Sequence, residues 1–69
     1  MGESVYKVIE LVGTSEVSWE DAAKKAIETA SKKLRELRIA EVTQQDLKVE
    51  SGKVTAYRTR VKLSFKYEA

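Results

Sequence analysis

The clearest pattern in this sequence runs from Val54 to Tyr67 and reads VTAYRTRVKLSFKY. From Tyr57 onward its odd-numbered residues are mostly aromatic or aliphatic, and the residues between them are charged or polar. Because side chains of a strand alternate between the two faces of a sheet, this pattern predicts a long half-buried strand over residues 54–67. The face expected to meet the core carries Tyr57, Thr59, Val61, Leu63, Phe65 and Tyr67.

The residues just before this strand predict a hairpin. Ser51-Gly52 lies between two β-rich segments, and such a pair is typical of a tight turn. Residues 38–50 read RIAEVTQQDLKVE and predict an antiparallel partner strand. Their apolar residues do not keep to one face, so we expect a bulge or bend near Gln44-Gln45.

The N-terminal segment predicts another strand. Residues 5–12 read VYKVIELV and are rich in β-branched and aromatic residues. Apolar residues occur on both parities, which predicts a strand covered on both faces. We expect Gly13-Thr14-Ser15 to end it.

A helix is predicted after this strand. Ser18 is placed to cap it, and Glu20 and Asp21 suit the positively polarised first turn. Apolar residues then recur at spacings of three and four, which predicts one apolar stripe over about five turns. The stripe consists of Trp19, Ala22, Ala23, Ala26, Ile27, Ala30, Leu34 and Leu37.

These elements predict an α+β fold with the order β-α-β-β and a single domain over residues 1–69. A chain of 69 residues buries a small core, and it has no cysteine for a disulfide. The predicted third strand is about 45 Å long at about 3.3 Å per residue. The predicted helix, at about 30 Å, is too short to cover it. We therefore expect a homo-oligomer, in which other copies cover the rest of the sheet.

The composition excludes several classes of protein. With no histidine and no cysteine, the chain lacks Ser-His and Cys-His nucleophile pairs and the usual zinc ligands. Glu41 and Asp46 are five residues apart, which puts them on opposite faces of a regular strand, so we predict no catalytic residues and no enzyme. A net charge of +2 from 13 basic and 11 acidic residues argues against a nucleic-acid partner. No targeting or membrane segment is visible, so we expect a cytoplasmic protein without a membrane partner.

Four segments resemble the dodecin family: VYKVIELVGTS (5–15), SWEDAA (18–23), RIAEV (38–42) and VKLSFKYE (61–68). The resemblance implies a three-stranded antiparallel sheet wrapped around one long helix. It also implies a hollow homododecamer. Dodecins typically bind flavins in stacked pairs and store or quench them without turning them over.

The resemblance also indicates the flavin positions, and this chain departs from them. Ile39 stands where flavin-binding dodecins have a tryptophan that stacks on the ring, and an aliphatic side chain does not supply aromatic stacking. Arg58 stands where they have a glutamine that hydrogen-bonds the ring edge, and arginine has donors but no acceptor. Together with Gln45, these are the candidate ligand-binding residues. The usual flavin site is therefore expected to be altered.

The segment IAEV followed by Gln45-Asp46 more closely resembles a divergent dodecin branch described as calcium-binding. Calcium takes six to eight oxygen ligands. The acidic candidates have no recognisable ligand spacing, so the metal residues stay unassigned: Glu16, Glu20, Asp21, Asp46 and Glu50. The cofactor stays open between calcium and flavin. We predict a dodecameric protein that binds or stores a small molecule or an ion. The alternatives are a purely structural assembly with a closed pocket, and retained binding of FMN or riboflavin.

Two further expectations concern single side chains. A basic stripe on the third strand has three interpretations: a solvated face, ion pairs between subunits, which we favour, and binding of anionic ligands. It consists of Arg58, Arg60, Lys62 and Lys66. Within it, we predict that Arg58 pairs with Glu41 or Asp46 and closes the former flavin pocket. We expect Trp19 to be a half-buried anchor where the helix begins.

Overall fold

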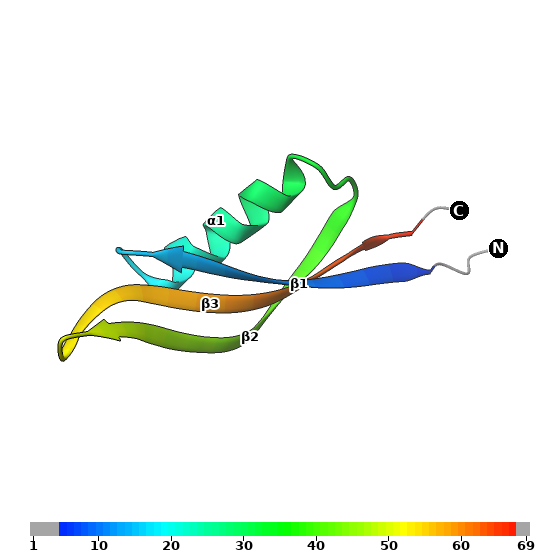
Figure 1. Cartoon of the computed structure of the whole chain (residues 1–69). Coiled ribbons are helices and arrows are strands. Elements are labelled where there is room, and N and C mark those ends of the chain that lie inside the picture. Colours follow the sequence, from blue (N-terminus) through cyan, green and yellow to red (C-terminus); the bar gives the residue numbers. More distant parts are fainter. Residues whose placement is uncertain (1–4, 68–69) are drawn as a thin grey trace.

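The computed structural model describes residues 5–67 and has four elements (Figure 1). They are β1 (Tyr6–Ser15), α1 (Trp19–Ser31), β2 (Leu37–Glu50) and β3 (Lys53–Lys66). The sheet has the order β1-β3-β2 with both pairs antiparallel, and α1 lies across one of its faces. The predicted β-α-β-β order and antiparallel sheet are confirmed.

The core lies between α1 and the central strand β3. Thr59, Val61 and Leu63 are at most 1% exposed, so the predicted alternation of β3 is confirmed. From α1, Ala22 and Ala26 are buried against this face. Their small side chains let the helix approach the sheet closely.

Gly13 is the point of closest approach, and it corrects one prediction. Gly13-Thr14-Ser15 does not end the first strand but forms its last three residues, which pair with β3 as far as Tyr57. A Cβ atom at Gly13 would lie 2.1 Å from the carbonyl oxygen of Ala22. Only glycine therefore lets α1 pack directly on the backbone of β1.

The helix is shorter than predicted from the stripe of apolar residues, which continues to Leu37. Ser18 caps it as expected, with its Oγ accepting from the backbone N–H of Asp21 at 3.0 Å. It ends at Ser31, and the chain reverses near Glu36, which has a φ of 61°. Leu34 and Leu37 thus lie outside the helix, and Leu37 reaches the core as the first residue of β2. Thirteen residues give α1 a length of about 20 Å.

The hairpin and its bulge confirm two predictions. Ser51 and Gly52 both have positive φ, at 51° and 74°, which is the geometry of a type I′ turn. The register of β2 shifts between Val42 and Gln44, close to the bulge predicted near Gln44-Gln45. Two further shifts, after Leu37 and after Lys48, were not predicted.

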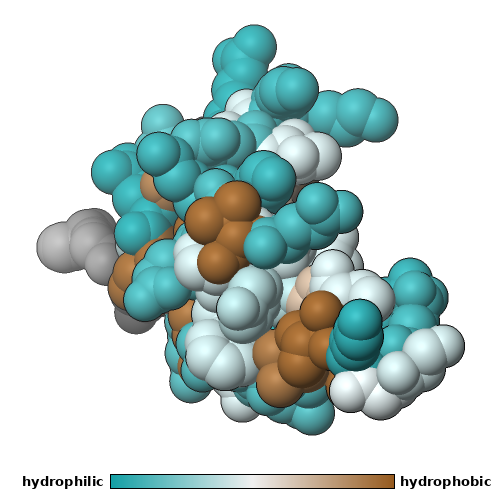
Figure 2. Space-filling model, turned by 90° about the vertical axis from the view of Figure 1, so that its left-hand side faces the viewer, coloured by the Kyte–Doolittle hydropathy of each residue, from teal (hydrophilic) through white to brown (hydrophobic). Residues whose placement is uncertain are grey.

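Much apolar surface stays exposed in this elongated chain, which measures 55 × 20 × 16 Å. Figure 2 shows separate apolar groups between hydrophilic side chains at the hairpin end. The prediction that both faces of β1 are covered is wrong for a single chain, because Val8 and Val12 are exposed. The second face has no covering element in residues 5–67, since α1 lies only on the first.

Candidate functional site

The sheet face turned away from α1, here called the outer face, carries charged side chains in rows across the three strands. The register places Thr14, Arg58 and Asp46 in one row. A second row consists of Glu10, Lys62 and Glu41. Opposite charges directly across a sheet attract, and one pair in these rows, Arg58 with Asp46, forms an ion pair that joins β3 to β2. The rows together form a candidate binding face.

Arg58 donates two hydrogen bonds to the carboxylate of Asp46. Its Nε lies 2.7 Å from Oδ1 and its Nη2 lies 2.9 Å from Oδ2, so both groups donate to the same carboxylate. This bidentate geometry is the strong form of an arginine–carboxylate pair. The hydrogen bond from Arg58 lowers the pKa of Asp46, and the same bond raises the pKa of Arg58.

The predicted carboxylate partner of Arg58 is therefore found, and it is Asp46 of the same chain. Glu41 lies opposite Lys62 instead. Sequence spacing predicted that Glu41 and Asp46 point to opposite faces. That placement holds only for a regular strand, and a bulge could change it. The shift between Val42 and Gln44 does so and brings both to the outer face, opposite Lys62 and Arg58.

Ile39 is far from Arg58 within one chain. It is an exposed residue opposite Ser64, six positions along β3 from Arg58. Six residues of strand span about 20 Å, which exceeds the reach of one ring system. A site that uses both positions has to take Ile39 from one copy and Arg58 from another.

Gln45 lies on the opposite side of the sheet from these two residues. It pairs with Thr59, whose side chain is buried beneath α1. It lines a groove of about 420 Å³ between α1 and β2, together with Trp19, Ala23, Ile27, Val42 and Thr59. The structure therefore does not bring the three predicted ligand-binding residues together in one chain.

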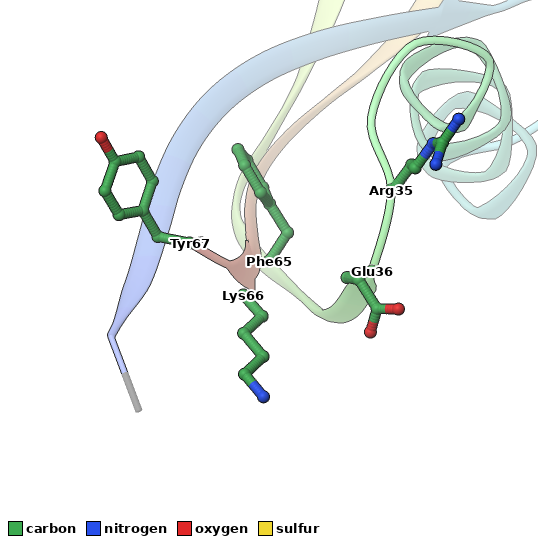
Figure 3. A pocket seen from close by; sticks show the side chains of 5 residues that line it. All are labelled: Arg35, Glu36, Phe65, Lys66 and Tyr67. Carbon is green, nitrogen blue, oxygen red and sulfur yellow. The ribbon is translucent and has the colours of Figure 1, made fainter. Parts of the chain in front are cut away.

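A second cleft of about 420 Å³ lies at the other end of the molecule (Figure 3). It is lined by Arg35, Glu36, Phe65, Lys66 and Tyr67. Figure 3 shows Lys66 and Glu36 directed to one side, and Arg35 and Phe65 to the other. These side chains do not converge on one point, so the cleft is a weaker candidate than the outer face.

The described residues of one chain do not form a complete calcium site. Among residues 5–67, no three acidic, histidine or cysteine side chains gather closely enough to hold a metal ion. Three of the candidate donors are already in ion pairs: Asp46 with Arg58, Asp21 with Lys25 at 3.1 Å and Glu50 with Lys48 at 3.5 Å. The donor set within the described residues of one chain therefore does not fit the six to eight oxygens that calcium takes.

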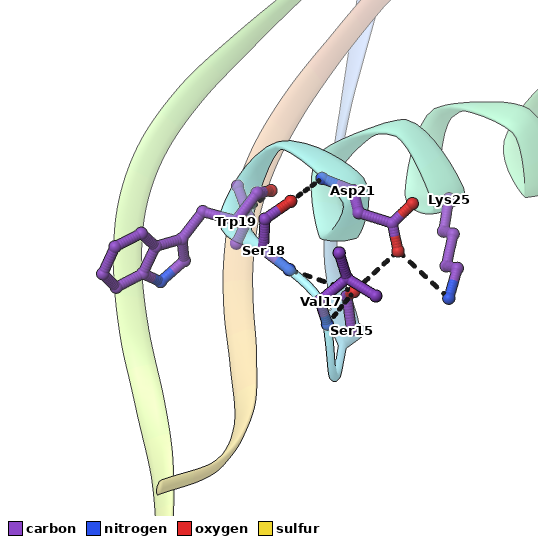
Figure 4. Close-up of polar contacts among 7 residues, drawn as sticks. Ser15, Val17, Ser18, Trp19, Asp21 and Lys25 are labelled. Atoms are coloured by element: carbon purple, nitrogen blue, oxygen red, sulfur yellow. Dashed lines mark hydrogen bonds and ion pairs between the residues drawn. The ribbon is translucent and has the colours of Figure 1, made fainter.

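Ser15 is a structural residue that the sequence reasoning missed (Figure 4). Its hydroxyl donates to Oδ2 of Asp21 at 2.6 Å and accepts from the backbone N–H of Val17 at 2.9 Å. The hydrogen bond from Ser15, followed by that from Lys25, lowers the pKa of Asp21. This network ties the end of β1 to the first turn of α1.

Trp19 is half-buried where α1 begins, as predicted. Its indole N–H donates to the carbonyl oxygen of Asp46 at 3.0 Å. Its ring meets Tyr57 edge to face, with 5.2 Å between ring centroids. No signal in the sequence indicated that this tryptophan contacts the partner of Arg58.

Within the described part of the chain, α1 is too short and too polar to cross a bilayer.

Comparisons with known proteins agree with this fold. The family model for dodecin matches residues 5–68. Calcium dodecin from Mycobacterium tuberculosis is 48% identical over 64 residues, which cover 91% of this chain and 89% of that protein.

Solved structures agree as well. A crystal structure of that calcium dodecin, described as having a calcium-binding site, gives a TM-score of 0.84 at 45% identity, covering 94% of this chain and 93% of that one. Dodecin from Streptomyces coelicolor gives a TM-score of 0.92 at 38% identity, covering 100% and 99%. The family model matches residues 5–68, which include the whole described fold and the four segments that resemble dodecins. This chain therefore belongs to the dodecin family.

Proposed function

We propose that this chain assembles into a dodecin-type hollow homododecamer that binds and stores a cation or small molecule. Calcium is the first candidate, and the flavin position is closed by Arg58. The observation that carries the closed flavin position is the pair of hydrogen bonds from Arg58 to the carboxylate of Asp46, at 2.7 and 2.9 Å. The 48% identity to a protein named calcium dodecin supports the choice of ion.

Exposed apolar side chains support the assembly. Val8, Ile39 and Val42 are each at least half exposed in the single chain, although the chain is small. Apolar surface of this kind is expected to be covered in an oligomer. Native mass measurement should give a dodecamer, and a stable monomer would contradict the proposal.

Calcium binding is expected to need the assembly, because residues 5–67 of one chain do not bring enough acidic groups together. Calorimetric titration of chelator-treated, assembled protein should show heat of binding with calcium and much less with magnesium, which demands a stricter octahedron. A stoichiometry of one ion per two or per three chains would place the ion on a symmetry axis. Absence of calcium binding at millimolar concentration would contradict the choice of ion.

The closed flavin position is tested by a double-mutant cycle. Ile39→Trp restores the stacking ring and Arg58→Gln restores an amide, so we expect tight FMN binding only when both changes are present. Ile39→Trp alone should gain little, because Arg58 and Asp46 would still fill the site. Quenching of FMN fluorescence in the wild type, both single variants and the double variant gives the coupling.

Arg60 offers a matched control for this cycle. It lies on the same face of β3, and its Nη1 is 3.9 Å from Oε1 of Glu10, so it is a looser pair. Ile39→Trp combined with Arg60→Gln should therefore not bind FMN tightly. Tight FMN binding by the unmodified protein, or by Ile39→Trp alone, would show that Arg58 does not block the site.

The closed pocket also favours a second candidate, a purely structural assembly. In that case the intact dodecamer would bind neither calcium nor FMN. The calcium titration and the FMN titration therefore separate the two functions in one set of samples.

A further inference from the structure

Trp19 connects the start of α1 to the edge strand β2. Its indole N–H donates to the carbonyl oxygen of Asp46, 27 residues further along the chain, at 3.0 Å. Figure 4 shows the indole directed away from the helix toward β2. The same Asp46 holds Arg58 with its carboxylate on the outer face of the sheet. One residue is thus contacted through its main chain by Trp19 and through its side chain by Arg58.

Trp19 also contacts both chain neighbours of Arg58. Thr59 is fully buried, and its Oγ1 donates to the carbonyl oxygen of Trp19 at 2.9 Å. The ring of Tyr57 meets the indole at an interplanar angle of 76°, a favourable edge-to-face contact. Because neighbours on a strand point to opposite faces, Tyr57 and Thr59 contact Trp19 while Arg58 points to the outer face.

The strand that carries Asp46 needs this support. Asp46 lies in a five-residue segment of β2 with regular register, Gln44 to Lys48, and the register shifts at both ends of that segment. β2 is also an edge strand with β3 as its one partner in the sheet. A short segment between two irregularities has few ladder hydrogen bonds to fix it, so a bond from outside the sheet has a larger effect on its position.

We propose that Trp19 is the positioning residue of the Arg58–Asp46 pair. Its indole N–H fixes the main chain of Asp46 where the carboxylate accepts both hydrogen bonds from Arg58. Trp19 thereby controls, from the helix side of the sheet, a charged pair on the outer face. The consequence for ligand binding, that Trp19 keeps Arg58 over the flavin position, rests on the proposed function.

The chain itself provides the control for the test, because Asp21 and Asp46 are its two aspartates. Protein labelled with ¹³C at the aspartate carboxyl carbon therefore gives two signals to titrate. The hydrogen bond from Arg58 is the main cause that lowers the pKa of Asp46, and the hydrogen bond from Ser15 is the main cause that lowers the pKa of Asp21. In Trp19→Phe, which keeps a ring but removes the N–H, the pKa of Asp46 should rise toward its ordinary value. The pKa of Asp21 should not change.

Two outcomes of this titration would overturn the proposal. An unchanged pKa of Asp46 would show that the indole N–H does not position the pair. A parallel rise in the pKa of both aspartates would show general loosening of the helix start. Tyr57→Phe is the matched control, because it removes a hydroxyl from the same aromatic cluster and should leave the pKa of Asp46 unchanged.

A second form of the protein keeps the test decisive if Trp19→Phe does not assemble. Trp19 is the sole tryptophan, and a chain of 69 residues is accessible to chemical synthesis. A synthetic chain with 3-benzothienylalanine at position 19 keeps the shape of the indole and replaces its N–H with sulfur. The same rise in the pKa of Asp46, without a change in Asp21, is expected.

FMN titration separates this inference from the proposed function. In an Ile39→Trp background, adding Trp19→Phe should tighten FMN binding by about tenfold, which corresponds to about 1.4 kcal/mol. If the pKa of Asp46 rises but FMN affinity does not, Trp19 positions the pair and Arg58 does not close the flavin site. If the pKa of Asp46 stays unchanged, the positioning role is wrong whatever FMN does.

Discussion

β2 and β3 are both 14 residues long and pair with each other, yet their surroundings differ. β3 is the central strand, and three of its residues that face α1 are at most 1% exposed: Thr59, Val61 and Leu63. β2 is an edge strand whose register shifts at three places and whose apolar residues are largely exposed. By contrast, β1 and β3 pair without a shift from Tyr6 to Ser15.

The difference shows that one chain covers the helix-facing side of β3 over Thr59, Val61 and Leu63, whereas it leaves most of β2 exposed. The layer formed by α1, β1 and β3, here called the covered layer, should therefore respond strongly to substitutions in any state of assembly. The response of β2 should depend on whether other copies cover it. The predictions below test this contrast between the covered layer and β2, from the largest expected effect to the smallest.

The largest effect is expected at Gly13 in the covered layer. In Gly13→Ala the new Cβ would lie 2.1 Å from the carbonyl oxygen of Ala22 and 3.1 Å from Cβ of Ala26. Because both groups belong to the helix, α1 has to move away from β1. We expect a loss of at least about 3 kcal/mol in the free energy of unfolding, or no folded protein. Urea denaturation followed by circular dichroism measures it.

Gly52 is the matched control for this substitution. Its φ is 74°, but a Cβ there meets no atom within 4 Å. Gly52→Ala should cost only about 1 kcal/mol, from backbone strain in the hairpin. If the two substitutions cost the same, the close packing of α1 on Gly13 is wrong.

A second test compares two valines that pair across β3 and β2. Val61 is fully buried and Val42 is 50% exposed. Val61→Ala should lower the free energy of unfolding by about 2 kcal/mol, and Val42→Ala by less than about 1 kcal/mol in a dissociated chain. If another copy covers β2, the two costs should become similar in the assembled protein. Denaturation at protein concentrations above and below dissociation distinguishes the two cases.

The sequence was most informative where one chain determines the environment of a residue. The alternation of β3 was predicted because α1 buries one of its faces. The Ser18 cap and the Ser51-Gly52 turn were predicted because both depend on local chemistry. The length of α1 was not predicted correctly, because the apolar spacing continued past Ser31 as far as Leu37. Leu37 packs against the core but belongs to β2.

The candidate site was only partly predictable, for a related reason. The pairing of Arg58 with a carboxylate followed from chemistry, but its choice of Asp46 depended on the register after the bulge at Val42. A shift of one residue exchanges the faces of a strand, so parity in the sequence put Glu41 and Asp46 on opposite faces although both lie on the outer face. The contact of Trp19 with Asp46 joins residues far apart in the chain, and no local pattern encodes it.

A third test concerns the hydroxyl that joins β1 to α1 in the covered layer. Ser15 is 4% exposed, donates to Asp21 and accepts from Val17. Ser15→Ala removes the acceptor of the Val17 N–H and leaves the Asp21 carboxylate with Lys25, and it should cost about 1–2 kcal/mol in the free energy of unfolding. Ser31→Ala removes an exposed hydroxyl that donates to the carbonyl oxygen of Glu28, and should change stability by less than about 0.5 kcal/mol. Equal costs would contradict the role of Ser15 in closing the covered layer.

The smallest effect is expected from the pH dependence of two aspartates, one in each region. Ser15 and Lys25 lower the pKa of Asp21 in the covered layer, and Arg58 lowers the pKa of Asp46 in β2. A carboxyl whose pKa is lower in the folded state stabilises the fold above its unfolded value of 3.8. That stabilisation disappears as pH falls through the lowered folded-state pKa. The free energy of unfolding should therefore decrease between about pH 5 and about pH 2.

Asp21→Asn and Asp46→Asn should each make this decrease smaller, and the double variant should combine the two effects, because the aspartates share no hydrogen-bond partner. Denaturation at neutral and acidic pH, in low salt, measures each contribution. If Asp46→Asn leaves the acid dependence unchanged while Asp21→Asn reduces it, the Arg58–Asp46 pair is not held in solution. In that case the segment of β2 around Asp46 would be held as weakly as the three places where the register of β2 shifts. The candidate site would then differ from the covered layer in the same way as the rest of β2.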